Sequence, residues 1–180
     1  MPGSRCGMNR IKTLLRSDLP LHFILLATNW LPDNVFFLRL RGFLCRPFFG
    51  SCGRQVNIGR NVNFYNPANI HLGDYVHIAY GCFLLAVDHI WVDKEVMFGP
   101  YCVLVSGNHT RYEGSYRFGA DKLSPIHIHQ GCWLGSHVTV TAGCVVGQGS
   151  LLAAGAVVIS DIPQNTMAGG VPAREIKKIT

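Results

Sequence analysis

Charged side chains are scarce in this chain: aspartate, glutamate, lysine and arginine make up only 14% of its 180 residues, whereas hydrophobic residues make up 48%. So low a share of charge in a small soluble domain indicates surface that is covered by other subunits or by a membrane. The charges present are mostly positive, with a net charge of +6. We therefore expect an anionic partner, such as a phosphorylated cofactor, an acidic polymer or an anionic lipid.

Several patterns are missing, and each absence excludes a class of protein. No dense lysine and arginine cluster with interleaved aromatic residues is present, so no nucleic-acid partner is expected. The seven cysteines include no CxxC pair and match neither a zinc site nor a disulfide framework, which favours reduced thiols in the cytosol. The apolar stretch 19–49 is too interrupted to span a bilayer, and residues 1–19 lack the apolar region of a signal peptide. We therefore expect a cytoplasmic protein.

What the chain does have is a repeat of six residues. An aliphatic or aromatic anchor recurs at every sixth position, as in Ile58, Phe64 and Ile70, and the series resumes at Ile128 after an interruption. A small or β-branched residue, four times a cysteine (82, 102, 132 and 144), follows the anchor by four positions. This period fits a short strand and a tight turn, with three such units closing a triangular coil. The sequence therefore predicts a mainly β protein, a parallel β-helix with anchors and cysteines pointing inwards.

The segment before the repeats has a different composition. We expect the β-helix over residues 56–180, with a C-terminal tail at 161–180, and a helical segment over residues 1–55. In 35–46 an apolar stripe lies beside Arg39, Arg41 and Arg46, which fits a helix that caps the open end of the β-helix. The same basic and amphipathic pattern fits a helix that rests on a membrane surface, and the two interpretations are compatible.

The repeats stop between Leu104 and Ile128, and a long insertion in a regular array is usually a functional loop. Of the eight histidines, only His109 stands where the coil meets the loop at 106–125. A neutral imidazole can take a proton near neutral pH, so His109 is predicted as a general base, with Asp88 as the candidate that orients it. The candidates for binding the substrate within the loop are Asn108, Tyr112 and Asp121.

These features resemble the hexapeptide-repeat acyltransferases, whose fold is a left-handed parallel β-helix. In its galactoside, maltose and polysaccharide O-acetyltransferases a catalytic histidine stands at the same junction, and a tryptophan follows it on the resumed helix, here Trp133. The ending Gly-Gly-Val-Pro-Ala-Arg at 169–174 is similar to the C-terminal signature of the family. The resemblance covers roughly residues 56–180.

The resemblance implies acetyl transfer from acetyl-CoA to a sugar hydroxyl, without a covalent acyl-enzyme. It places acetyl-CoA in a groove between neighbouring subunits of a homotrimer. The family's cofactor positions fall on Trp133, Ser136, Ala154, Ile159, Ser160, Arg174 and Lys177. Arg174 and Lys177 would supply positive charge for the CoA phosphates, whereas the family often has lysine where Ser160 stands.

The acceptor side departs from the galactoside and maltose enzymes. Their sugar-binding asparagine falls at 79–81, where this chain has no amide, and their acidic residue aligns with Val87 or Asp88. The long apolar N-terminal segment instead resembles enzymes that acetylate capsule, O-antigen or exopolysaccharide sugars. We therefore expect a cell-surface polysaccharide or its precursor as acceptor, and a cytoplasmic protein that can lie peripherally at the inner face of the membrane.

Three other functions stay open at this point. An N-acyltransferase acting on an amino sugar would use the same histidine. A zinc enzyme of the γ-class carbonic anhydrase type needs three converging histidines, but His71 and His77 are six apart and occupy successive faces, so no metal is expected. A non-catalytic scaffold would keep the β-helix, but His109, Trp133 and Arg174 together argue against one.

Overall fold

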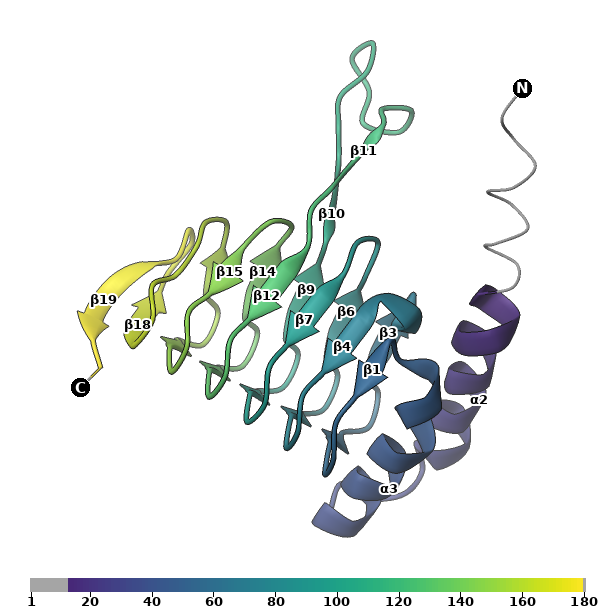
Figure 1. Ribbon diagram of the computed structural model, residues 1–180. Helices are drawn as coiled ribbons and strands as arrows, with labels where there is room; N and C mark the ends of the chain where they lie inside the picture. The colour runs from purple at the N-terminus through teal and green to yellow at the C-terminus, as the bar shows by residue number, and fades with distance from the viewer. Residues whose placement is uncertain (1–12, 180) are drawn as a thin grey trace.

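The computed structural model describes residues 13–179, which form a stack of β-coils with helices at one end (Figure 1). The helical elements are η1 (Leu14–Asp18), α2 (Leu19–Thr28), α3 (Val35–Cys45), η2 (Arg46–Phe48) and, inside the stack, η3 (Pro67–Asn69). Within the described residues, no helix is long and apolar enough to cross a membrane.

Three sheets form the sides of the stack, and their stacked strands pair in parallel, apart from β18 with β19. Face 1 consists of β1 (Ser51–Cys52), β4 (Ile70–Leu72), β7 (Ile90–Val92), β12 (Ile126–Ile128) and β15 (Val145–Val146). Face 2 consists of β2 (Asn57–Ile58), β5 (His77–Ile78), β8 (Met97–Phe98), β13 (Trp133–Leu134), β16 (Leu151–Leu152), β18 (Thr166–Gly169) and β19 (Arg174–Lys178). Face 3 consists of β3 (Asn63–Tyr65), β6 (Phe83–Leu85), β9 (Val103–Val105), β14 (Thr139–Thr141) and β17 (Val157–Val158).

The hexapeptide anchors line the interior in register. On face 2, Ile58 pairs with Ile78, which pairs with Phe98, and each is at most 1% exposed. Stacking identical positions of successive coils in this way produces one continuous apolar core. The predicted parallel β-helix with N-terminal helices and an inserted loop is therefore confirmed. Its first strand, β1, lies before residue 56, where the repeats were expected to begin.

The inward cysteines belong to this core. Cys82, Cys102 and Cys132 are fully buried, and the cysteines among residues 13–179 are free thiols, whereas Cys6 lies outside the described residues. Burial raises the pKa of the Cys132 thiol above its usual value. It also raises the pKa of Cys45, the last residue of α3, to about 12. Thiols that are buried and protonated pack as small apolar side chains, as the sequence predicted.

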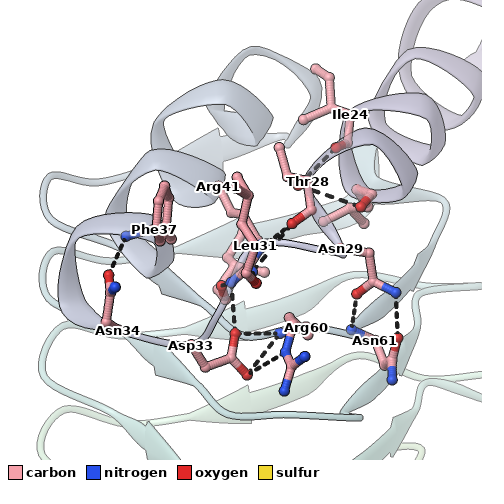
Figure 2. Close-up of polar contacts among 12 residues, drawn as sticks. Ile24, Thr28, Asn29, Leu31, Asp33, Asn34, Phe37, Arg41, Arg60 and Asn61 are labelled. Atoms are coloured by element: carbon pink, nitrogen blue, oxygen red, sulfur yellow. Dashed lines mark hydrogen bonds and ion pairs between the residues drawn. The ribbon is translucent and has the colours of Figure 1, made fainter.

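Helix α3 packs closely on the first coil of the stack. A Cβ atom on Gly42 would lie 2.0 Å from the carbonyl oxygen of Val56, so only glycine allows this approach. The neighbouring Arg41 is fully buried, with its guanidinium 2.8 Å from Asp33 (Figure 2). The guanidinium also lies 3.2 Å from the carbonyl oxygen of Ile58. Asp33 also accepts a hydrogen bond from the backbone N–H of Arg60 at 3.1 Å. This ion pair therefore joins the helices to the β-helix.

Candidate active site

The insertion at 106–125 contains a β-hairpin that projects from the stack (Figure 1). Its strands β10 (Gly107–His109) and β11 (Asp121–Leu123) pair antiparallel, which puts His109 opposite Asp121. The hairpin leaves the stack after β9 of face 3 and returns to β12 of face 1, so it stands at the corner between these two faces.

The base of the hairpin is tied to the preceding coil by Ser106, which is fully buried. Its hydroxyl donates to the carbonyl oxygen of Asp88 at 2.7 Å and accepts from the backbone N–H of Asp88 at 2.9 Å. A Cβ atom on Gly107 would already touch the side chains of Val87 and Leu123 at 3.2 Å. The strand that carries His109 is therefore held in a fixed position by packing and by hydrogen bonds.

The partner of the His109 ring is Asp121, whose Oδ1 lies 2.9 Å from Nδ1. When Nδ1 carries a proton and donates it to this carboxylate, Nε2 holds the free lone pair and can accept a proton. Both side chains are more than half exposed, so the pair is accessible to a substrate. The geometry is that of a general base with an orienting carboxylate.

The structure thus corrects one sequence-based assignment. Asp88 was predicted to orient His109, but the carboxylate of Asp88 accepts a hydrogen bond from the backbone N–H of His89 at 2.7 Å, and the backbone of Asp88 holds Ser106. The orienting contact comes from Asp121, which was predicted to bind substrate. The sequence did not reveal this contact, because it depends on the register of two strands that residues 110–120 separate in the chain.

The other loop candidates, Asn108 and Tyr112, lie at different positions along the hairpin. Asn108 is next to His109 on β10 and pairs with Lys122 on β11, so its side chain points to the opposite side of the hairpin. Tyr112 stands beyond the paired strands, where its backbone N–H donates to the carbonyl oxygen of Ser115 at 2.8 Å. Both side chains are exposed.

The predicted cofactor positions divide into separate groups. Trp133 is exposed on β13 of face 2, and Ser136 and Ala154 follow at the next corner, stacked on successive coils. Ile159 and Ser160 come directly after β17 of face 3, at the corner from which the hairpin projects. The remaining two, Arg174 and Lys177, are exposed on β19 at the edge of face 2.

This division separates Trp133 from His109 within one chain. In a triangular coil, the corner between faces 3 and 1 lies opposite face 2. The hairpin projects from that corner, whereas the Trp133 side chain points outwards from face 2. Within one chain, Trp133 and His109 therefore stand on different sides of the stack.

The fold is shared with solved acetyltransferase structures. The crystal structure of a maltose O-acetyltransferase from Clostridium difficile 630 superimposes with a TM-score of 0.81 and 32% identity, covering 93% of this chain and 88% of the other. The chain belongs to the hexapeptide-repeat acetyltransferase family. Residues 125–160 match the family described as bacterial transferase hexapeptide (six repeats).

Two further members of this acetyltransferase family are informative. A galactoside acetyltransferase in complex with coenzyme A has a TM-score of 0.80 and 27% identity, covering 91% of this chain and 80% of that one. WbbJ of Escherichia coli K12, named for O-acetyl transfer in lipopolysaccharide biosynthesis, is 31% identical over 67% of this chain. The matched part spans 54% to 68% of the length of the first curated relatives, and 62% of WbbJ.

Proposed function

We propose that the protein transfers the acetyl group of acetyl-CoA to a sugar hydroxyl, with His109 as general base. The observation that carries the proposal is the His109–Asp121 pair on a fixed hairpin of a hexapeptide-repeat acetyltransferase fold. Nε2 of His109 takes the proton of the acceptor hydroxyl while the oxygen of that hydroxyl attacks the thioester carbonyl of acetyl-CoA. The CoA thiolate then leaves and is protonated by the imidazolium, which returns His109 to its neutral form.

The cofactor site in this proposal lies between subunits of a homotrimer. It is supported by the positions of Trp133 and His109 on opposite sides of one chain, because a neighbouring copy can place its Trp133 beside the His109 of this chain. The relative with coenzyme A bound supports acetyl-CoA as the acetyl donor. Arg174 and Lys177 are exposed on β19, where their charges are free to meet the CoA phosphates.

The acceptor in this proposal is a cell-surface polysaccharide or its precursor. The similarity to WbbJ favours such an acceptor, as does the absence of an amide side chain at 79–81. O-acetylation is the reaction named for the maltose, galactoside and WbbJ relatives, which favours a hydroxyl over an amino group.

The test is CoA release from acetyl-CoA in the presence of a panel of acceptors. The panel contains free maltose and galactosides, nucleotide sugars, amino sugars, and polysaccharide or lipid-linked glycan fragments. We expect acceptor-dependent thiol release with the glycan fragments and little with the free disaccharides. If CoA is released faster with amino sugars and the acetyl group is found on nitrogen, N-acylation replaces this proposal. If the protein does not bind acetyl-CoA at all, only the scaffold function is left.

The N-terminal helices offer a surface that suits a membrane. Large apolar side chains are exposed on these helices and on the turn after α2: Leu14, Leu15, Leu19, Phe23, Leu26, Trp30, Val35, Phe36 and Phe43. The exposed charges beside them include Arg16, Arg39 and Arg46, whereas the nearby Asp33 is engaged by Arg41 and Arg60. Apolar groups flanked by free cations fit the interface of an anionic bilayer. We therefore propose peripheral contact with the inner face of the membrane.

We expect the protein to sediment with vesicles that contain anionic phospholipid, and less with purely zwitterionic ones. Replacing Trp30 and Phe36 by serine removes two of the most exposed apolar groups and should weaken binding by at least about 10-fold. Phe118→Ser is the matched control, because Phe118 is equally exposed but lies in the hairpin insertion. Unchanged sedimentation of the double variant would contradict the membrane contact.

A further inference from the structure

A second cluster of polar side chains lies on face 1, away from the His109 hairpin. Asp93 follows β7, and His127 and His129 stand on and after β12, the next strand of the face. The carboxylate of Asp93 contacts both rings: Oδ1 lies 2.9 Å from Nε2 of His127 and Oδ2 lies 3.0 Å from Nδ1 of His129. One donor atom from each of these residues falls within 4.8 Å of the others.

The strand register explains why these residues converge. His127 pairs with Trp91 of β7, and the backbone N–H of Asp93 donates to the carbonyl oxygen of Ile128, which places Asp93 beside His129. Ile128 points into the core, so the side chains of His127 and His129 both point outwards on the same face. Parallel strands one coil apart are about 4.8 Å from each other, close enough for one small ion to reach both coils.

We propose that Asp93, His127 and His129 bind one zinc ion. Two imidazole nitrogens and one carboxylate oxygen form a donor set that Zn²⁺ favours, at bond lengths of about 2.0–2.2 Å. Tetrahedral coordination at these lengths needs donor atoms about 3.4 Å apart, which the observed spacing reaches with small side-chain rotations. Coordination uses the lone pairs of Nε2 of His127 and Nδ1 of His129, so each neutral ring carries its proton on the other nitrogen when the ion is bound.

The surroundings leave the ion accessible from solvent. The three side chains are each between 37% and 39% exposed, so the ion pays only part of the desolvation cost of a buried site. Beside Asp93 lies a cavity of about 390 Å³, lined among others by Trp91, Lys94 and Gln130. A three-residue site with this opening keeps a fourth position for water or for an anionic ligand.

The ion would join two coils that the sequence keeps far apart. Asp93 is separated from His127 and His129 by 34 and 36 residues, and the whole hairpin that carries His109 lies between them. Elsewhere neighbouring strands of face 1 follow one another without such an insertion. The zinc ion therefore clamps the coil before the hairpin to the coil after it, independently of any catalytic role of His109. The sequence analysis expected no metal, because it considered only histidines such as His71 and His77, which occupy successive faces.

The experiment measures zinc binding directly on the full chain without an affinity tag of histidines. After dialysis against a chelator, the protein is titrated with Zn²⁺ against a chromophoric competitor, and Co²⁺ is used separately as a spectroscopic probe. We expect one ion per chain, visible absorption bands of a tetrahedral cobalt site, and a higher melting temperature with zinc. Asp93→Asn and His129→Gln, both at partly exposed positions, should each weaken zinc binding by about 100-fold or more.

His71→Gln is the matched control. His71 also stands outwards on face 1 and bonds another histidine, with its Nε2 3.0 Å from Nδ1 of His89, but it lies outside the proposed site. We expect this variant to bind zinc as the wild type does. Zinc binding that is lost in His71→Gln and kept in Asp93→Asn would overturn the assignment, as would a wild-type chain that binds no zinc at micromolar concentration.

Discussion

Replacing His109 by alanine should reduce acetyl transfer by about 10²- to 10⁴-fold, because the acceptor hydroxyl then has no base to take its proton. The KM for acetyl-CoA should stay nearly unchanged, since the imidazole acts on the acceptor oxygen. The His109 side chain is 74% exposed and lies on a strand held by Ser106 and Gly107, so its removal should leave the fold intact. Initial rates of CoA release, measured with the best acceptor of the panel, provide the comparison.

The companion variant Asp121→Asn separates orientation from proton transfer. An amide at this position can donate a hydrogen to Nδ1 and so favour the tautomer in which Nε2 is protonated and no longer a base. We expect a loss in kcat of about 10-fold or more and a changed pH profile, with little change in KM. Asp88→Asn should have a much smaller effect, because its carboxylate contacts the backbone of His89 rather than the ring of His109. Equal losses in the two variants would contradict the assigned orientation.

The sequence was sufficient to predict the β-coils and the position of the insertion, because both depend on the repeat of six residues. Ile58 and Ile78 repeat the same environment one coil apart, so each repeat independently predicts an inward position. Contacts across the hairpin depend instead on its register, which is why Asp121 was assigned to substrate binding rather than to His109. The group at Asp93 was missed for a different reason, because the inserted hairpin separates Asp93 from His127 by 34 residues in the sequence.

The N-terminal helices were harder to predict, because a buried charge and exposed apolar side chains occur there together. Arg41 was predicted as one of three charges beside an apolar stripe, yet it is fully buried, whereas Phe23 and Trp30 are exposed. Periodicity assumes that charge faces water and apolar groups face the core. A buried ion pair and an outward apolar surface violate this assumption at the same time, and only the packing of α3 on the first coil reveals which side is buried.

Replacing Arg41 by methionine should lower the free energy of unfolding by about 3–5 kcal/mol, the usual cost of removing one partner of a buried ion pair. The loss has several parts. The carbonyl oxygens of Thr28 and Leu31 accept hydrogen bonds from the guanidinium (Figure 2), as does the carbonyl oxygen of Ile58. All three would lose this donor. The Asp33 carboxylate would keep only its contacts to Arg60.

Denaturant unfolding of Arg41→Met, compared with Arg39→Met, tests this expectation on one helix. Arg39 is exposed on α3 two residues earlier, so its replacement should change stability by less than about 0.5 kcal/mol. Hydrogen exchange should quicken first in α2 and α3, because the guanidinium bonds the end of α2, the connecting segment and the first coil at once. A loss below about 1 kcal/mol would mean that methionine packing offsets the broken ion pair, as happens when a buried charge is replaced by an apolar side chain that fits. In that case the Arg41–Asp33 ion pair would determine how the N-terminal helices are oriented on the stack, and would contribute little to the free energy of unfolding. The orientation of the exposed apolar surface would then be what depends on Arg41.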